Sequence, residues 1–275
     1  MDEFAKEYFQ KLKVLTHDFE GRRLELAKSR IKMFAAAITR QLLEFDETFD
    51  LLIGAGNSGL YMTKITEMTY QYLNAAVPKI LNIPIVRFKE DGKILNDNSF
   101  LLPEVKQILG KINAIKNVLF VDDEIMRAIT AKECFELLLK ANQNISHFDA
   151  TIVAEHHFFE WHYKLPKVSI RFFAYSPLIQ YLNANISYFI PEDLYQEISK
   201  YTKGISSHNE IMAIVIGGAV KRIKQQPFYD SSIEKVLQEK IPNYEERKAI
   251  LTKSLQKLVK EGVDEYRTGK ITFRF

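Results

Sequence analysis

Four apolar residues that end in two adjacent carboxylates constrain the fold of this chain more than any other feature. The run Val118–Val121 is followed by Asp122 and Asp123, and a helical pattern begins at about Thr130. A short apolar run of this kind is typical of a buried strand, and in a parallel sheet the carboxyl ends of strands face the ligand crevice. Two acids there can accept hydrogen bonds from sugar hydroxyls or hold a divalent cation. The turn before the helix offers free N–H groups and a positive dipole end, which suit a phosphate.

Strands, turns and helices alternate on both sides of this segment. We expect strands over residues 49–53, 80–88, 117–121, 150–154 and 168–174. We expect helices over residues 22–45 and 130–141, a helix that follows residue 59 and ends at about residue 76, and a short helix that begins at residue 104. Residues 90–103 are polar and predict a long exposed loop. The order predicts an α/β fold with a mostly parallel sheet in a core of residues 46–190.

Helical segments are expected on both sides of this core. Residues 1–45 form an N-terminal helical segment, and residues 191–275 form a C-terminal helical region. In the C-terminal region the apolar spacing predicts helices over 191–201, 211–220, 231–240 and 244–261. The sequence does not indicate what this region does.

Charge and hydropathy exclude two classes of partner. The 275 residues include 38 basic and 35 acidic side chains, a balance too even to indicate nucleic acid or an anionic membrane surface. No stretch approaches the roughly 20 apolar residues that span a bilayer, and the charged N-terminus lacks a signal-peptide core. We therefore expect a cytoplasmic protein. The one cysteine, Cys134, lies among apolar residues and is expected to be a buried thiol rather than a nucleophile.

A glycine-rich turn follows the first predicted strand. Gly54-Ala-Gly-Asn-Ser-Gly59 stands between an apolar run and a predicted helix. Glycines there let the backbone approach an anion closely, but they equally suit a tight strand-to-helix turn without any ligand. The next predicted strand ends in a basic segment with Arg87, Lys89 and Lys93. These side chains either contact an anionic ligand or are solvated.

Taken in order, the three segments resemble the ligand-binding motifs of type I phosphoribosyltransferases, which use phosphoribosyl pyrophosphate (PRPP). The specific motif is Val118–Thr130, with four apolar residues, two acids and a threonine at the family's spacing. The glycine turn resembles the family's pyrophosphate loop. The strand end at Arg87 resembles that of orotate and adenine phosphoribosyltransferases. The resemblance covers about 130 residues, from Phe49 to Pro177.

The resemblance implies a phosphoribosyltransferase-like core that binds PRPP or another phosphorylated ribose with Mg²⁺. It implies transfer of the phosphoribosyl group to a nitrogenous base with release of pyrophosphate. Asp122 and Asp123 would hold the ribose hydroxyls and contribute to a magnesium site. The implied phosphate contacts are Met126, Arg127, Ala128, Ile129 and Thr130, and the implied pyrophosphate contacts are Gly56, Asn57, Ser58, Gly59, Arg87 and Lys89. The resemblance does not identify the acceptor base, and it allows a homodimer without requiring one.

Two departures from the family pattern keep a second function open. Arg127-Ala128-Ile129 stands where the family has Thr-Gly-x, and Ser58 stands where many members have a lysine or arginine. Without the glycine the backbone wraps a phosphate less closely, although Arg127 can offer a charge-assisted contact. The alternative is a regulatory or binding module that keeps the fold without catalysis.

Two segments of the sequence also fit other classes of site. The run from Val118 to Glu124 also resembles the first strand of a response-regulator receiver domain, whose acids bind magnesium. That class needs a phospho-accepting aspartate at a later strand end, and Asp149 precedes its predicted strand. Glu155-His-His-Phe-Phe-Glu-Trp-His162 holds three histidines and two acids, which makes it a candidate metal site. Without a distant Cys/His cluster in the sequence, an aromatic segment at the crevice rim fits it better.

Overall fold

The centre of the molecule is a five-stranded parallel sheet with the strand order β2-β1-β5-β6-β7. The computed structural model describes residues 23–45, 48–85, 88–90, 93–95, 98–112, 114–125, 129–155, 168–176, 186–202, 207–216 and 231–273. The strands of this sheet are β1 (Leu51–Ala55), β2 (Lys79–Ile83), β5 (Asn117–Ile125), β6 (His147–Glu155) and β7 (Ser169–Ser176). The predicted α/β fold with a parallel sheet is therefore confirmed.

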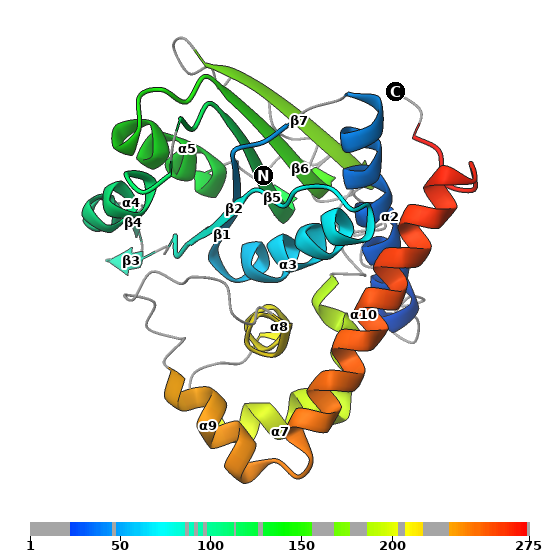
Figure 1. Cartoon of the computed structure of the whole chain (residues 1–275). Helices are drawn as coiled ribbons and strands as arrows, with labels where there is room; N and C mark the ends of the chain where they lie inside the picture. The colour runs from blue at the N-terminus through cyan, green and yellow to red at the C-terminus, as the bar shows by residue number, and fades with distance from the viewer. Residues whose placement is uncertain are drawn as a thin grey trace, which may run out of the picture.

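Helices cover both faces of the sheet (Figure 1). One face carries α2 (Arg23–Glu44) and α3 (Gly56–Tyr72), and the other carries α4 (Leu102–Leu109), preceded by the 3₁₀ turn η2 (Ser99–Leu101), and α5 (Ile129–Ala141). Successive strand residues point to opposite faces. Leu52 and Leu119 therefore join the cluster with α2 and α3, whereas Leu51 and Phe120 join the cluster with α4 and α5. Burial on both faces explains why β1 and the first part of β5 are continuous apolar runs.

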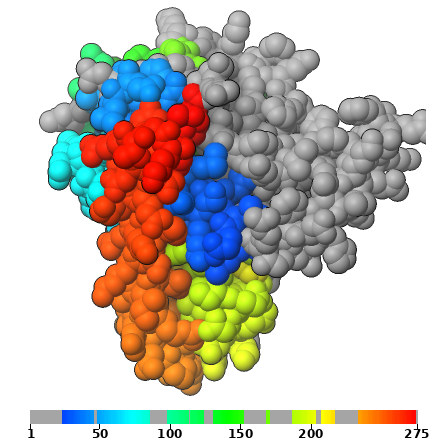
Figure 2. Space-filling model, turned by 90° about the vertical axis from the view of Figure 1, so that its right-hand side faces the viewer, coloured from blue at the N-terminus to red at the C-terminus, as the bar shows by residue number. Residues whose placement is uncertain are grey.

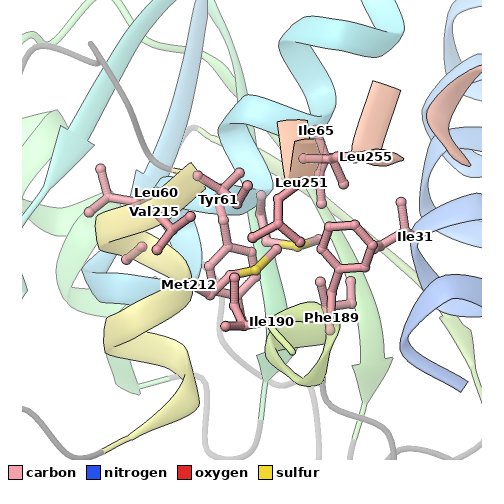
Figure 3. Packing of buried hydrophobic residues seen from close by; sticks show 14 of the residues in the cluster. Ile31, Leu60, Tyr61, Ile65, Phe189, Ile190, Met212, Val215, Leu251 and Leu255 are labelled. Carbon is pink, nitrogen blue, oxygen red and sulfur yellow. The ribbon is translucent and has the colours of Figure 1, made fainter. Parts of the chain in front are cut away.

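The C-terminal helices extend the face that α2 and α3 cover. They are the 3₁₀ turn η3 (Ile186–Phe189) and the helices α7 (Glu192–Tyr201), α8 (His208–Ile216), α9 (Ser231–Lys240) and α10 (Tyr244–Arg267). In the space-filling view α10 lies along α2 on one side of the molecule (Figure 2). α8 packs against α3. A single buried cluster includes Ile31, Tyr61, Met212 and Leu255, so the N-terminal, central and C-terminal segments share one core (Figure 3).

Several element boundaries differ from the sequence prediction. β5 continues to Ile125, so the two acids lie inside the strand rather than after it. The predicted strand 80–88 ends at Ile83, because Pro84 has no N–H to donate to a neighbouring strand. Asp149 lies inside β6, not before it. In α8 the helix begins at His208, and residues 217–220 of the predicted helix lie outside the described residues.

The predicted loop 90–103 is only partly a loop. Residues 88–95 contain the antiparallel hairpin of β3 (Phe88–Glu90) and β4 (Lys93–Leu95). Asp-Gly between two short runs is a recognised hairpin signal, and it outweighs the polarity that predicted a loop. None of the helices in the described ranges combines the length and apolarity needed to cross a bilayer.

Candidate functional site

The two acids lie where the strand order reverses. From β1 the chain first adds β2 on one side and then crosses to β5 on the other. In parallel sheets ligands bind outside the carboxyl ends of the strands at such a switch point. β1 pairs with β5 only as far as Gly54 and Val121, whereas β5 continues along β6 to Ile125. Asp122 and Asp123 therefore come directly after the last residue of β5 that pairs with β1.

The glycine turn brings α3 directly against the end of β1. A Cβ on Gly54 would lie 2.2 Å from the carbonyl oxygen of Gly59, and a Cβ on Gly59 would lie 2.4 Å from the carbonyl carbon of Gly54. These two glycines are explained by close packing alone. Gly56 has a φ of +63°, which favours glycine, and it opens α3. Ala55 at the N-cap has no side-chain hydrogen bond to the first turn of α3.

A pocket of about 380 Å³ unites residues from five parts of the chain. Its walls are Ala55, Gly56, Asn57, Ser58, Ile85, Asp122, Asp123, Thr130, Ser207 and Asn209. Six of these residues were candidates from the sequence: Gly56, Asn57, Ser58, Asp122, Asp123 and Thr130. The structure thus brings the glycine turn, the acid pair and the start of α5 together.

Hydrogen bonds anchor both acids, which are almost fully buried, with 6% of Asp122 and 4% of Asp123 exposed. The Ser58 hydroxyl donates to Asp122 Oδ1 at 2.5 Å, and the backbone N–H of Asp123 donates to the same oxygen at 2.9 Å. The Tyr61 hydroxyl donates to Asp123 Oδ2 at 2.7 Å. Ser58 and Tyr61 are three residues apart on α3, so one helix face orients the pair.

Burial raises the pKa of Asp122 well above its usual range, and repulsion from the charge of Asp123 raises it further. The hydrogen bond from Ser58 acts in the opposite direction but is the smaller influence on this pKa. Asp122 therefore keeps its proton to a higher pH than an exposed aspartate would. Burial, followed by the charge of Asp122, also raises the pKa of Cys134, which is fully buried as expected.

The remaining candidates are distributed differently. Gly59 is buried in the first turn of α3 and is not part of the pocket wall. Arg87, Met126, Arg127 and Ala128 lie outside the described residues, as do residues 156–162 of the histidine-rich segment. The backbones of Lys89, Lys93 and Ile129 lie in β3, β4 and α5, and their side chains are outside the described set. Across the described residues, no three His, Cys, Asp or Glu side chains gather as a metal site.

Sequence reasoning missed Tyr61, Ile85, Ser207 and Asn209. Tyr61 could have been found from its three-residue spacing after Ser58 on a predicted helix. Ser207 and Asn209 lie at the start of α8, about 85 residues after the acids, and no motif links the two segments. Only the three-dimensional packing of α8 against α3 brings them to the pocket.

Comparison with known proteins gave remote similarity only. No protein-family model and no curated protein sequence matches the chain. Among solved structures, a hypothetical protein from Neisseria gonorrhoeae with bound ppGpp is 15% identical, with a TM-score of 0.37, over 52% of this chain and 78% of that one. A purine phosphoribosyltransferase from Pyrococcus horikoshii is 16% identical, with a TM-score of 0.32, over 52% and 82%. A hypoxanthine phosphoribosyltransferase from Trypanosoma cruzi is 13% identical, with a TM-score of 0.34, over 55% and 78%. These likenesses are too distant to assign a family or a function.

Proposed function

We propose that the pocket binds a phosphorylated ribose such as PRPP and that the chain is a phosphoribosyltransferase. The observation that carries this proposal is the meeting of Asp122 and Asp123 with the first turns of α3 and α5 in one pocket. Carboxylates accept hydrogen bonds from vicinal hydroxyls, and helix N-termini attract phosphate. A diol between two phosphate groups is the ligand chemistry that this combination fits.

Each part of the pocket has a role in the proposal. Asp122 and Asp123 hold the ribose 2′- and 3′-hydroxyls. Residues 126–130 bind the 5′-phosphate. The start of α3, with Gly56, Asn57 and Ser58 in the pocket wall, binds the pyrophosphate together with Arg87 and Lys89.

The donor set also fits Mg²⁺. Mg²⁺ prefers oxygen ligands and is commonly held by one or two carboxylates together with phosphate oxygens and water. Asp122 and Asp123 are the two carboxylates among the described residues of the pocket wall. Bound with PRPP, Mg²⁺ would offset the negative charge of the pyrophosphate. Asp122 and Asp123 would hold it, and its charge would favour ionisation of both acids.

The reaction would be a displacement at C1 of the ribose. The lone pair of a base nitrogen forms the new C1–N bond, while the C1–O bond breaks and its electron pair leaves on the pyrophosphate. The nitrogen then loses its proton to solvent. The chain contributes position, because the acids fix the ribose, and electrostatic stabilisation, because the N-terminus of α3 faces the leaving group.

Calorimetric titration with PRPP, with and without Mg²⁺, tests the binding step. We expect saturable binding that strengthens with Mg²⁺ and weakens at least tenfold when Asp122→Asn and Asp123→Asn are combined, because the diol loses its charged acceptors. The matched control removes two exposed carboxylates elsewhere, Glu239→Gln with Glu246→Gln, and should bind as the wild type does. No heat from PRPP with wild-type protein contradicts the proposal, and an unfolded acid-pair variant would show that the pair is structural.

A non-catalytic binding module is the second candidate, supported by a specific contact. The Ser58 hydroxyl, at a position where many phosphoribosyltransferases have a cation, is bound to Asp122 rather than directed at a leaving group. Release of pyrophosphate from PRPP in the presence of a panel of nucleobases separates the two functions. Binding without release for every base supports the module, and steady release with any base supports the transferase.

A further inference from the structure

The first turn of α8 brings two polar residues to the pocket, Ser207 and Asn209, and they are not equivalent. Ser207 is used within its own helix. Its backbone N–H and its hydroxyl donate to Glu210 Oε2 at 3.0 and 2.9 Å, and the Glu210 N–H lies 3.2 Å from the Ser207 hydroxyl oxygen. This reciprocal capping box occupies the polar groups of Ser207.

Asn209 has a different environment. Among the described residues, its side chain has one hydrogen-bond partner, the Tyr61 hydroxyl, 3.0 Å from Oδ1. Tyr61 is fully buried, and its hydroxyl also lies 2.7 Å from Asp123 Oδ2. Asn209, which comes from the C-terminal region, is therefore linked to the acid pair through the hydroxyl group of Tyr61.

Counting protons orients the Asn209 amide. A tyrosine hydroxyl has one proton, and the carboxylate of Asp123 is both the closer acceptor and the stronger one. When the Tyr61 hydroxyl donates its proton in a hydrogen bond to Asp123, it has none left to donate to Asn209. The contact between Asn209 and Tyr61 is then satisfied if the NH₂ group of Asn209 points toward the phenol oxygen and donates to it. This orientation requires only a rotation of the amide, which exchanges two atoms of similar size. The carbonyl oxygen of the amide then faces the pocket as an acceptor.

We propose that Asn209 is a specificity-determining residue that accepts a hydrogen bond from an N–H group on the base of the ligand. This inference rests on the proposed function, because it assumes that Asp122 and Asp123 hold the ribose. The base is attached at C1, next to the carbon whose hydroxyl an acid would bind. A residue linked to Asp123 through Tyr61 is within reach of that substituent. The C-terminal region thus contributes base recognition to the site.

Calorimetry with two kinds of probe tests this role. Ribose 5-phosphate carries the sugar and phosphate alone, and the adenosine, guanosine, cytidine and uridine 5′-monophosphates add bases with N–H donors. We expect wild-type protein to bind at least one nucleotide more tightly than ribose 5-phosphate. Asn209→Ala should reduce that advantage about tenfold, the effect of one good hydrogen bond, and leave ribose 5-phosphate affinity within twofold.

Two further variants identify the atom and control for disturbance of the helix. Asn209→Asp retains an acceptor oxygen and lacks the NH₂ group, so the ratio of nucleotide to ribose 5-phosphate affinity should stay close to the wild-type ratio. Glu210→Ala loosens the same turn of α8 without changing Asn209, and it should also preserve the ratio. If Asn209→Asp loses the preference as fully as Asn209→Ala does, the recognising atom is not the oxygen and the proposal is wrong.

Failure of this inference can be told from failure of the proposed function. If ribose 5-phosphate binds and depends on Asp122 and Asp123, but no nucleotide gains affinity or Asn209→Ala leaves the gain unchanged, the function stands and the role of Asn209 is overturned. An equal loss for both probes in Asn209→Ala also overturns it. If neither probe binds to wild-type protein, both ideas are wrong.

Discussion

Two buried aspartates on neighbouring strands show how surroundings decide what an acid contributes. Asp122 lies beside a second carboxylate, and burial raises its pKa. Asp149 is fully buried, but it accepts a hydrogen bond from Gln41 Nε2 at 2.7 Å and lies 2.7 Å from His147 Nε2. Asp149 has hydrogen-bond partners on α2 and on its own strand, whereas Asp122 has a second carboxylate beside it. Poorly compensated buried acids are found more often at functional sites than in structural networks.

The effect of Asp122→Asn on the free energy of unfolding, relative to wild type, should become more favourable as the pH rises. A carboxyl whose folded pKa is raised contributes stability below its unfolded value near 4 and loses it as the pH rises through the folded pKa. Each pKa unit of difference corresponds to about 1.4 kcal/mol. Asparagine resembles the protonated acid and does not titrate. Urea unfolding at pH 4.5 and pH 8 should therefore show a larger gain, or a smaller loss, for the variant at pH 8.

The matched control is Asp149→Asn, which neutralises an equally buried acid one strand away. It replaces a charge-assisted hydrogen bond with a neutral one, so it should lower the free energy of unfolding by about 1 kcal/mol. A pH-dependent gain in Asp149→Asn as large as that expected for Asp122→Asn would mean that burial alone sets the effect, without a contribution from the second acid.

The sequence predicted which acids matter but not what surrounds them. An apolar run that ends in two carboxylates is a local pattern, so Asp122 and Asp123 could be found without a structure. The gathering of Ser58, Tyr61 and Asn209 around them depends on how α3 and α8 pack, and no local pattern encodes that contact. The predicted strand began after Asp149, and the hydrogen bond that Asp149 accepts from Gln41 on α2 is not visible in the sequence.

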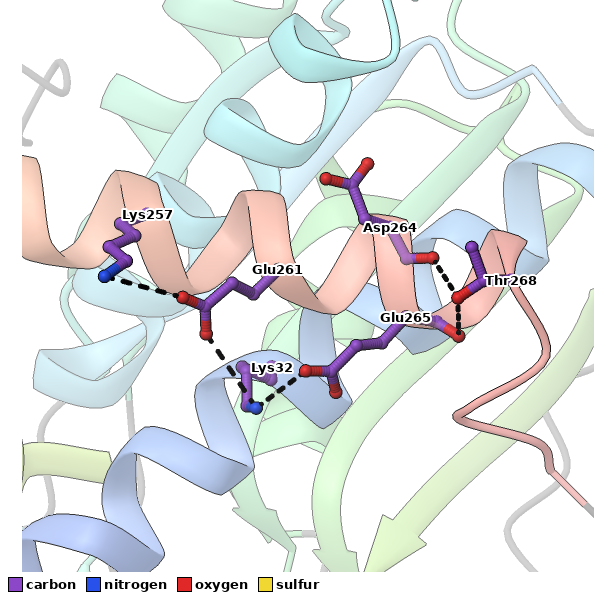
Figure 4. Close-up of polar contacts among 6 residues, drawn as sticks. All are labelled: Lys32, Lys257, Glu261, Asp264, Glu265 and Thr268. Carbon is purple, nitrogen blue, oxygen red and sulfur yellow. Dashed lines mark hydrogen bonds and ion pairs between the residues drawn. The ribbon is translucent and has the colours of Figure 1, made fainter.

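At the scale of elements, the contact of α2 with α10 shows how a glycine lets two helices approach. A Cβ on Gly262 of α10 would lie 2.3 Å from the backbone carbonyl oxygen of Lys32 on α2. The side chain of Lys32 lies 2.9 Å from Glu265 Oε1 and 3.8 Å from Glu261 Oε2 (Figure 4). These ion pairs are partly exposed and contribute little, so the close approach of the backbones is the more important feature.

Gly262→Ala should destabilise the protein, against the usual preference of helices for alanine. The added methyl group would meet backbone atoms of α2, which cannot move aside as a flexible side chain can. We expect a loss of about 2–3 kcal/mol in free energy of unfolding, typical of overpacking. Thermal and urea unfolding measure this loss. The control is Gln256→Ala on the exposed face of α10, which should change stability by no more than about 0.5 kcal/mol. If the two variants are equally stable, α2 and α10 can move apart to make room for the methyl group without a loss in free energy of unfolding.

Elements with a strong periodic pattern were the ones that sequence predicted well. The apolar stripe over 22–45 matches α2, and the expected helix over 231–240 matches α9. The hairpin of β3 and β4 was missed because each strand has only three residues, too few for an alternating pattern. α10 extends beyond the predicted end at residue 261, because Gly262, a usual helix terminator, is here required for packing.

At the scale of the whole molecule, the C-terminal region is part of the main core. Leu251, Leu255 and Val259 of α10 belong to the same buried cluster as Leu52 and Leu119 of the sheet. Figure 3 shows side chains of α3, α8 and α10 meeting in that cluster. The sequence could divide the chain into three segments by composition and periodicity, but packing between segments so far apart in the sequence leaves no trace in local periodicity.

This shared core predicts that α10 and the sheet unfold together. Native-state hydrogen exchange should give opening free energies for Leu255 in α10 and Leu119 in β5 that agree within about 1 kcal/mol, because one cooperative unit opens as a whole. Leu255→Ala should lower both values together by about 2–5 kcal/mol, the usual cost of truncating a buried leucine. Ile250→Ala is the matched control, since that side chain on the same helix is 56% exposed and should change neither value by more than about 0.5 kcal/mol. If α10 opens at much lower free energy and Leu255→Ala leaves Leu119 unchanged, the C-terminal region is a separate unit that docks on a finished core.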